Sequence, residues 1–305
     1  MEKVVVIGSL NMDLVAQVPR LPQRGETIAG FQFQMLPGGK GANQAFAVGR
    51  LDGTASMIGR VGDDLFGEQL KSSLTSVGVS VDSVLSTPGE STGIALILVE
   101  TGGQNQIVVA AGANGKLSPN DVRSELERAS AQYLLLQLES PLPTVEAAAV
   151  QGRRRGMSVI LDPTPAVPLS PLLLNSIDVL TPNESEALVL LGSQGESISL
   201  DQAAEVCSKL LALGPSCVIL KVGQHGVWFA DRNQSKHFPA PKVHAVDTTA
   251  AGDTFNGALA TALAEGRSFE MAIPFANCAA ALSVTRLGAQ ASIPSRREVD
   301  AMLAS

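Results

Sequence analysis

Asp247-Thr248-Thr249-Ala250-Ala251-Gly252-Asp253-Thr254-Phe255-Asn256-Gly257 is the stretch that decides the fold. After it, small or apolar side chains recur at helical spacing as far as Leu263, and Gly266 suits a left-handed helix end. The stretch therefore predicts a tight turn that leads into a helix, with residues 250–253 at the helix N-terminus. Unpaired backbone N–H groups and the positive end of the helix dipole attract anions at such a place.

An acid beside a bound anion needs an explanation, because Asp253 would repel a phosphate group. The natural task for its carboxylate is to take the proton from a hydroxyl group that attacks phosphorus. In isolation the motif is better explained by a helix-stabilising acid in the first turn. Gly252 has no Cβ, so a bulky anion can approach the backbone closely. The other motifs of the chain favour the catalytic role.

The composition indicates a large aliphatic core in an acidic protein. Of the 305 residues, 45% are hydrophobic, 17% charged and 4% aromatic, and the net charge is −7. This balance argues against nucleic acid or an anionic membrane surface as the main partner. No apolar run reaches the length of a membrane span, and the N-terminus lacks a signal-peptide layout. Three widely spaced cysteines in apolar settings favour buried thiols in a reducing compartment, so we expect a cytoplasmic protein.

Strands alternate with helices along most of the chain, which predicts a parallel sheet covered on both faces. We expect an α/β fold, a Rossmann-like three-layer α/β/α arrangement around a mostly parallel sheet, as a single domain over residues 1–305. Strands are predicted at 3–8, 57–62, 133–139, 159–162, 178–180, 217–222 and 227–230. Ligands in such folds lie beyond the carboxyl ends of strands, where polar residues can converge: Asn11, Asp13, Glu139, Asn183, Glu186 and Gly223.

Three further strands interrupt this rhythm. Residues 31–36, 92–100 and 104–111 have strand character, and Thr101-Gly102-Gly103 predicts a hairpin between the last two. We expect a small separate β-sheet, built from about 10–40 and 92–112, that acts as a lid over the Asn11 and Lys40 region. Lids exclude water and complete a site when the substrate arrives.

Asn11 and Asp13 follow the first strand and are two residues apart. In an extended segment their side chains point the same way, and an amide beside a carboxylate suits adjacent sugar hydroxyls. A turn rich in Asn and Asp explains the pair equally well.

Pro37-Gly38-Gly39-Lys40-Gly41-Ala42-Asn43-Gln44 is a glycine-rich run that opens a helix through about Arg50. Its spacing matches neither the phosphate loop of the nucleotide hydrolases nor the dinucleotide-binding fingerprint. We expect a backbone brought close to a small polar ligand, with Lys40 and Asn43 as donors. The alternative is a glycine-rich turn with a solvated lysine.

At these residues the chain resembles the ribokinase group of the PfkB carbohydrate kinase family, over nearly its whole length. The glycine-rich signature of the family is similar to residues 38–44, and its C-terminal signature to residues 247–255. The intermediate Asn-x-x-Glu motif corresponds to Asn183 and Glu186, and segments 137–141 and 181–184 are similar to ribokinases in particular. Two signatures and a motif in the correct order are far more specific than any one of them. The resemblance implies the ribokinase-like fold.

The resemblance also implies ATP-dependent phosphorylation of D-ribose at its 5-hydroxyl, giving ribose 5-phosphate and ADP. Asp253 would be the general base, and the backbone N–H groups of Ala250, Ala251, Gly252 and Asp253 would hold the charge of the transferred phosphoryl group. The sugar would be bound by Asn11, Asp13, Gly39, Lys40, Gly41, Asn43, Glu139 and Asp253. The nucleotide would be bound by Asn183, Glu186, Lys221, Gly223, His225, Gly226, Gly252 and Asn277, with Glu186 organising Mg²⁺ through water.

Activation by K⁺ and dimer formation are two further implications of the resemblance. The K⁺ positions would be Asp247, Thr249, Ser283, Arg286, Gly288 and Ser292, several of them through backbone oxygens. A cation beside the turn at 247–252 could fix the shape of the anion hole, although Asp247 is also explained as a turn-capping acid. A homodimer would form through the lid sheets, where an exposed edge favours pairing.

Two residues depart from the family pattern. Ala250 replaces the first glycine of the common Gly-Ala-Gly-Asp sequence, and its methyl group is acceptable if the φ angle there is negative. Lys221 stands where a smaller polar residue is common, and a positive charge near the phosphates would help binding.

Several alternatives remain open at this point. A sister kinase for deoxyribose, fructose or a nucleoside shares the motifs, although a nucleoside needs an apolar base pocket and aromatic residues are few. A catalytically silent sugar-binding regulator would be expected to lose Asp253 or Gly252, and neither is lost. An oxidoreductase that binds a dinucleotide is excluded by the glycine spacing.

Overall fold

The computed structural model describes residues 3–102, 104–193 and 198–304. Within them, nine strands form one sheet in the order β13-β12-β11-β10-β9-β8-β1-β4-β5. Neighbours from β11 to β5 pair in parallel, whereas β12 and β13 are antiparallel additions at one edge. The mostly parallel sheet expected from the sequence is confirmed. The strands are β1 (Val4–Ile7), β4 (Ala55–Gly62), β5 (Val84–Thr87), β8 (Tyr133–Leu136), β9 (Ser158–Leu161), β10 (Val179–Leu180), β11 (Cys217–Lys221), β12 (Val227–Asp231) and β13 (Ser235–Phe238).

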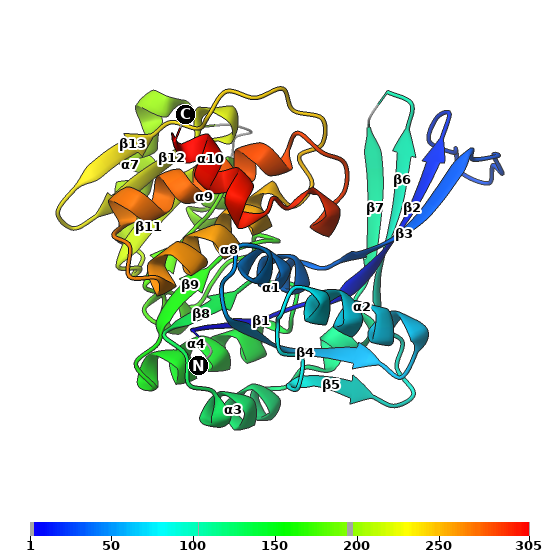
Figure 1. Cartoon of the computed structure of the whole chain (residues 1–305), viewed down its shortest axis with the longest axis horizontal. Helices are drawn as coiled ribbons and strands as arrows, with labels where there is room; N and C mark the ends of the chain where they lie inside the picture. The colour runs from blue at the N-terminus through cyan, green and yellow to red at the C-terminus, as the bar shows by residue number, and fades with distance from the viewer. Residues whose placement is uncertain (1–2, 103, 194–197, 305) are drawn as a thin grey trace.

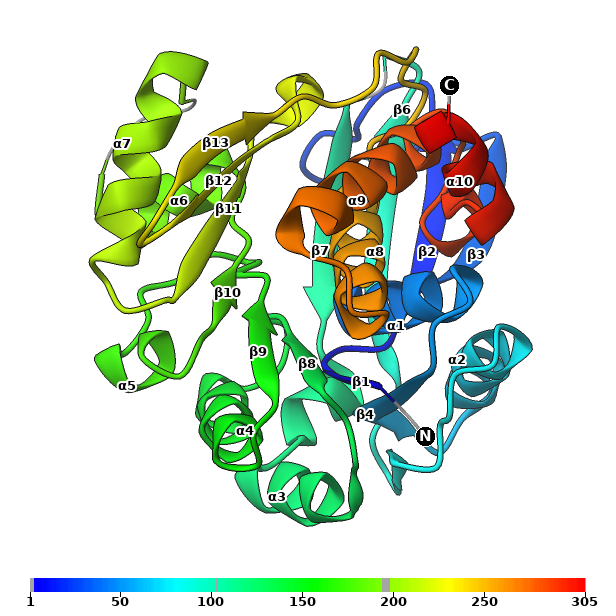
Figure 2. The same ribbon diagram turned by 60° about the vertical axis from the view of Figure 1, so that its left-hand side comes forward.

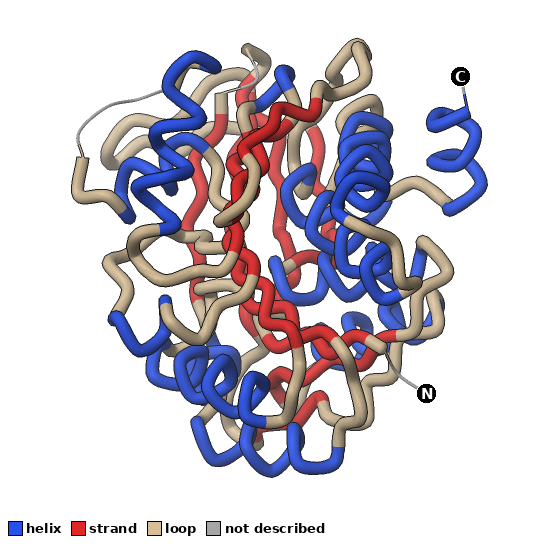
Figure 3. Tube along the Cα trace, turned by 90° about the vertical axis from the view of Figure 1, so that its left-hand side faces the viewer, coloured by secondary structure: helices blue, strands red, loops and turns tan. Residues whose placement is uncertain are grey.

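Helices cover both faces of this sheet, so the molecule has three layers (Figures 1, 2 and 3). One layer contains α1 (Lys40–Arg50), α2 (Leu65–Ser76), α8 (Ala251–Ala264), α9 (Phe269–Ser283) and α10 (Arg296–Ala304). The opposite layer contains α3 (Pro119–Arg128), α4 (Leu142–Arg154), α5 (Pro171–Leu174), α6 (Glu184–Leu190) and α7 (Leu200–Leu211). Three short 3₁₀ helices, η1 (Gly112–Lys116), η2 (Gly223–His225) and η3 (Gln290–Ser292), lie in loops.

The sheet divides the hydrophobic core in two, and β1 shows why its sequence is continuously aliphatic. Val4 and Val6 join the cluster under α1, α8 and α9, while Val5 and Ile7 join the cluster under α3, α4 and α7. All four side chains are buried, because successive residues of a strand point to opposite faces and both faces are covered.

A second sheet stands apart from this body, in the order β3-β2-β6-β7 (Figure 1). Its strands are β2 (Asn11–Val18), β3 (Gln32–Gly38), β6 (Gly93–Glu100) and β7 (Asn105–Ala110). The separate small sheet was predicted, but the strand over Asn11–Val18 was not. Met1, Glu2 and Gly103, part of the predicted N-terminus and hairpin, lie outside the described residues.

Helix ends follow the local sequence signals. Ser118 caps α3: its side chain accepts a hydrogen bond from the Asp121 N–H, and the Asp121 side chain accepts one from the Ser118 N–H. Gly266 ends α8 in a left-handed conformation, with φ of 85°. In the described part of the chain, no helix combines the length and apolar character that a membrane crossing requires.

Two predicted strands end earlier than expected, which changes where the polar side chains stand. The strand predicted at 133–139 stops at Leu136, and the Leu138 N–H donates instead to the Thr164 carbonyl at 3.0 Å. The strand predicted at 159–162 stops at Leu161. Glu139 and Asp162 therefore stand in loops beyond the carboxyl edge rather than within the sheet.

Candidate active site

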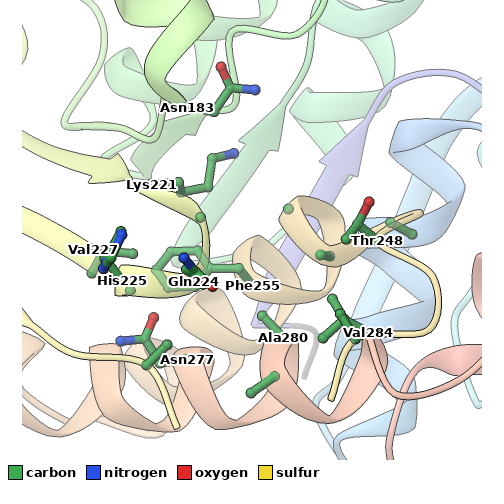
Figure 4. Close-up of a pocket in the computed structure, with 18 of the residues that line it drawn as sticks. Asn183, Lys221, Gln224, His225, Val227, Thr248, Phe255, Asn277, Ala280 and Val284 are labelled. Carbon is green, nitrogen blue, oxygen red and sulfur yellow. The ribbon is translucent and has the colours of Figure 1, made fainter. Parts of the chain in front are cut away.

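A cleft of about 1090 Å³ opens at the carboxyl edge of the parallel strands. Its wall combines the loop after β11, the start of α6 and the first turn of α8 with apolar residues of α9 (Figure 4). Lys40 and Asp253 lie at its inner end and come from segments more than two hundred residues apart. A cleft of this size, apolar along one wall and lined by several charged groups, suits a nucleotide-sized ligand.

The first turn of α8 presents free backbone donors to this cleft. Among the described residues, the N–H groups of Ala250, Gly252 and Asp253 have no protein acceptor. The Ala251 N–H differs from our expectation, since it already donates to the Thr248 carbonyl at 3.3 Å. The helix start therefore offers three of the four predicted amides to an anion.

Ala250 adopts a left-handed conformation with φ of 58°, so the condition of a negative φ, under which its methyl group would be acceptable, is not met. The Ala250 carbonyl accepts hydrogen bonds from the Thr254 N–H at 2.8 Å and the Thr254 hydroxyl at 2.9 Å. These two hydrogen bonds stabilise the turn at Ala250, after which the N–H groups of Gly252 and Asp253 remain free. A residue with a Cβ costs on the order of 1 kcal/mol in this conformation, and the turn bears that cost at the anion-binding end of the helix.

Asp253 is buried, and its carboxylate is held by two amide side chains from α1. Asn43 Nδ2 donates to Oδ2 at 3.0 Å and Gln44 Nε2 donates to Oδ1 at 3.1 Å. Burial raises the pKa of Asp253 to about 6, the Lys40 ammonium opposes this rise, and the charge of Asp162 adds to it. A carboxylate with this pKa, aimed into a cleft beside free amides, can act as a general base near neutral pH.

Lys40 is the cation at the centre of the site. Burial acts to lower the pKa of its ammonium group, but the surrounding carboxylates outweigh this and raise it above the usual value: Asp253, Asp162, Glu139 and Glu186. The lysine therefore remains charged and can attract an anion to the start of α8.

Asp13 and Glu139 stand on the other side of Lys40. Burial raises the pKa of Asp13 to about 7, and the charges of Glu139 and Asp253 add to the rise. Glu139 Oε2 accepts from the Ser9 hydroxyl at 2.5 Å and from the Lys40 backbone N–H at 3.2 Å. These neighbouring carboxylates can accept hydrogen bonds from a polyhydroxylated ligand.

The glycine-rich run makes room for this acid cluster. A Cβ on Gly38 would stand 2.3 Å from Asp13 Oδ2. A Cβ on Gly39, whose φ is 89°, would stand 2.6 Å from the Asn11 backbone nitrogen. The backbone of Gly41 packs on residues 8–9. The run thus brings the start of α1 against the β1–β2 junction. The expected close approach of this backbone to a small polar ligand stays a prediction.

Asn11 is buried and is held by Asn114, a residue that the sequence did not single out. Asn114 Nδ2 donates to Asn11 Oδ1 at 2.8 Å and to the Leu10 carbonyl at 3.0 Å, while Asn114 Oδ1 accepts from the Leu10 N–H at 2.9 Å. Because η1 follows the end of β7 and carries Asn114, the base of the second sheet is tied to the junction that positions Asn11 and Asp13.

The predicted nucleotide residues line the wider part of the cleft (Figure 4). Asn183 caps α6 and forms a reciprocal pair with Glu186, whose Oε2 accepts from the Asn183 N–H at 2.7 Å. Asn277 Nδ2 donates to the Phe238 carbonyl at 3.1 Å, which fixes one wall. The remaining predicted residues stand on the cleft wall as well: Lys221, Gly223, His225, Gly226 and Gly252.

Two site residues were missed by the sequence analysis. Asp162 is buried and accepts from Lys221 Nζ at 2.8 Å and from Gln44 Nε2 at 3.0 Å. Gln44, which also receives a bond from Gln137 Nε2 at 2.6 Å, joins Asp162 to Asp253. Gln44 could have been identified because it lies in the glycine-rich signature. Asp162 could have been identified because it stands at the carboxyl end of a predicted strand.

The predicted K⁺ residues lie on two loops behind the anion-binding turn. Asp247 accepts from the Thr249 N–H at 2.9 Å and from the Gly288 N–H at 2.9 Å, which joins the loops. Burial acts to raise the pKa of Asp247, but these hydrogen bonds outweigh it and hold the pKa below the usual value. Asp247 thus does cap the turn. The side chains of Ser283 and Ser292 donate to Ala280 and Ala289 carbonyls, and Arg286 pairs with Glu298.

The pH dependence of catalysis follows from the two raised pKa values. If Asp253 is the base, it must be ionised to accept a proton, so kcat at saturating sugar should fall on the acid side with an apparent pKa near 6, by about tenfold per pH unit below it. Protonation of Asp13, with its pKa of about 7, weakens sugar binding at a higher pH. Sugar dissociation constants measured against pH isolate the Asp13 contribution, and the variant Asp13→Asn should lose it. A flat kcat profile from about pH 5 to 8 would contradict the assignment of Asp253 as the base.

Comparisons with known proteins agree with this geometry. Residues 1–296 match the model of the pfkB family carbohydrate kinases. A ribokinase of Haemophilus influenzae is 43% identical over 294 residues, which cover 96% of this chain and 95% of the relative. A deoxyribokinase of Salmonella typhi is 36% identical, covering 96% and 95% respectively. The solved structure of Arabidopsis thaliana ribokinase complexed with ribose and ATP superposes with a TM-score of 0.91 at 35% identity, covering 100% of both chains.

Proposed function

The chain belongs to the pfkB family of carbohydrate kinases, and on that basis we propose that it phosphorylates D-ribose at the 5-hydroxyl with ATP. The observation that carries the proposal is the first turn of α8, where free amides and the buried Asp253 carboxylate meet at the inner end of the cleft. A phosphoryl group passing from ATP to an alcohol needs both features, a hole for its negative charge and a base for the hydroxyl proton.

Asp253 takes the proton of the 5-hydroxyl as that oxygen attacks the γ-phosphorus. Asn43 and Gln44 each donate a hydrogen bond to one oxygen of the Asp253 carboxylate. The remaining lone pairs of these oxygens can accept the proton of the sugar 5-hydroxyl. Asn11, Asp13 and Glu139 bind the other sugar hydroxyls. These contacts position the 5-hydroxyl, and positioning accounts for much of the rate in reactions of this kind.

The charge that develops on the transferred phosphoryl oxygens is stabilised by the free N–H groups of Ala250, Gly252 and Asp253 and by the Lys40 ammonium. These donors are in place before the reaction, so they cost no reorganisation. The apolar side chains of Phe255, Ala280 and Val284 line the cleft and suit the adenine base.

Mg²⁺ fits the donors at the start of α6. Both Glu186 oxygens already accept protein hydrogen bonds, from the Asn183 backbone and side chain and from Thr164. Contact through water therefore suits Glu186 and Asn183 better than direct ligation, and Mg²⁺ usually keeps several waters. When bound, the ion neutralises phosphate charge.

K⁺ fits the joined loops at 247–249 and 283–292. The side chains of Ser283, Arg286 and Ser292 are committed elsewhere, so their backbone carbonyl oxygens, with Asp247 and Thr249, would hold the cation. Bound there, K⁺ would steady the turn that exposes the Gly252 amide. Three buried free thiols, Cys207, Cys217 and Cys278, support a cytoplasmic location.

An assay of ADP release tests the function. We expect turnover with ribose to exceed that with deoxyribose, fructose and adenosine, and to rise several-fold when K⁺ replaces Na⁺ at constant ionic strength. Deoxyribose is the alternative acceptor to watch, since a deoxyribokinase is among the relatives. A higher kcat/KM with deoxyribose would reassign the substrate, and no ADP release above background with any sugar would refute the proposal. Equal rates in K⁺ and Na⁺ would contradict the proposed potassium site but not the proposed kinase activity.

The second sheet supports the proposal of a lid that also forms a homodimer. All six residues of β7 are exposed, including Ile107 at 54% and Val108 at 64%, and Phe33 of β3 is 60% exposed. Phe33 and Val108, together with Leu96 and Ile97, line a small apolar hollow on the sheet. Exposed apolar sheets of this kind are rare in monomers, and a second copy of the same sheet would cover them.

Val108→Lys is therefore expected to convert a dimer into a monomer, because it places a charge on β7, the apolar edge strand of the sheet. The measurement is sedimentation equilibrium of the wild type and the variant. Leu172→Lys is the matched control, since Leu172 is 56% exposed on α5 and should leave the mass unchanged. A monomeric wild type at micromolar concentration would contradict the dimer.

A further inference from the structure

Lys221 is a second lysine in the nucleotide cleft, and its position is unusually well defined. It ends β11, where its N–H donates to the Pro182 carbonyl at 2.8 Å and its backbone forms a bridge with Asn183. Its side chain is 13% exposed and ends 2.8 Å from Asp162 Oδ1. Figure 4 shows Lys221 between Asn183 and the first turn of α8, with its ammonium directed into the cleft.

The Lys221 ammonium also stands over the anion-binding turn. A Cβ built on Gly252 would lie 3.3 Å from Nζ, a tight contact that the glycine avoids. The free amides of Gly252 and Asp253 and the Lys221 ammonium thus border one small volume of the cleft. Lys40, which also lines the cleft, is the cation whose charge acts to lower the pKa of Asp253.

The hydrogen bonds of Lys221 leave it capacity for a ligand. An ammonium group has three donors, and within the described residues Asp162 is the only acceptor that Lys221 Nζ contacts. A purely structural buried ion pair would be expected to satisfy more of these donors within the protein. Asp162, in turn, is fixed by Gln44, which also holds Asp253.

We propose that Lys221 is an additional catalytic residue, whose ammonium contacts the γ-phosphoryl group above Gly252, and that Asp162 is the positioning residue that holds it there. The inference rests on the proposed function. Asp162 uses one donor of the ammonium, and the remaining two face the phosphoryl oxygens. Gln44 donates to both Asp162 and Asp253, so one hydrogen-bond network joins the residue that positions Lys221 to the proposed base.

The test combines turnover with a series of nucleotides in the full-length enzyme. Lys221→Met is expected to lower kcat by about 10²-fold, the usual loss when one donor to a developing charge is removed. The dissociation constant for ribose should not change. Affinity for the β,γ-imido analogue of ATP should fall about tenfold more than affinity for AMP, which has no γ-phosphoryl group. Lys209→Met, which removes an exposed lysine paired with Glu205, is the control.

Three further variants distinguish a folding defect from the loss of a catalytic contact. Lys221→Met leaves Asp162 as a buried charge without its cation, so the double variant Lys221→Met/Asp162→Asn should recover thermal stability but not kcat. Asp162→Asn alone should lower kcat less than Lys221→Met, and Lys221→Arg should restore part of the lost kcat and of the preference for the triphosphate.

The proposal is overturned if the double variant keeps kcat within about threefold of wild type, the scale of a contact absent from the transition state. It is also overturned if Lys221→Met weakens AMP and the imido triphosphate equally. Failure of wild-type enzyme to phosphorylate any sugar would refute the proposed function instead, and the nucleotide series would still decide whether Lys221 contacts the γ-phosphoryl group.

Discussion

Asp253→Asn is expected to abolish turnover, with kcat reduced by about 10³–10⁴-fold, because the amide cannot accept the proton of the attacking hydroxyl. The substitution is close to isosteric, so the packing of α8 against α1 should survive. One contact changes: Asn43 and Gln44 both donate to the native carboxylate, and one of them would meet the new amide nitrogen instead. The loss of rate should far exceed any loss of stability.

Three measurements on the same preparation decide the role of Asp253. Steady-state kinetics give kcat, titration calorimetry gives the dissociation constant for ribose, and thermal unfolding reports folding. We expect ribose binding to remain within about an order of magnitude of wild type, since other side chains bind most of the sugar. Asp82→Asn, at an exposed acid outside the site, is the control. Near-normal kcat in Asp253→Asn would remove this residue from the role of base.

Lys40→Met is expected to have the second largest effect, with a loss of about 10²–10³-fold in kcat. The ammonium stands among four carboxylates, and it opposes the rise in the pKa of Asp253. Its removal both deprives the phosphoryl group of a cation and makes the base harder to ionise. The acid limb of the kcat profile should therefore move to higher pH, which loss of a phosphate contact alone would not cause.

Lys71→Met, at an exposed lysine of α2, is the matched control and should change neither kcat nor the pH profile. If Lys40→Met lowers kcat but leaves the acid limb in place, Lys40 stabilises the charge of the phosphoryl group and does not lower the pKa of Asp253. A kcat unchanged at neutral pH would contradict both roles.

The sequence alone was sufficient for most of the architecture, although the strands over Asn11–Val18, Val84–Thr87 and Ser235–Phe238 were not predicted. Alternation of aliphatic strands with amphipathic helices predicted the mostly parallel sheet, because hydrophobic periodicity reports directly which faces are buried. Local signals placed the cap of α3 and the glycine end of α8. The family signatures, which are contiguous, indicated the residue that we propose as the general base and the helix start that we propose binds the anion.

Only the tertiary structure decided how separate signals combine. The left-handed Ala250 was not predicted, since its conformation is imposed by bonds from Thr254 and by the surrounding loops rather than by its own preference. Asp162 and Gln44 are 118 positions apart in the chain, yet one hydrogen bond joins them, and a one-dimensional pattern carries no record of such a contact.

The same distinction holds for the charges of the site. Composition predicted an acidic protein, but the pKa values of Asp13 and Asp253 rise because folding removes their carboxylates from water and places them near other acids. The residue types, and the helix end that carries them, were determined by local sequence. Their chemistry was decided by burial and by distance, which exist only after the chain has folded.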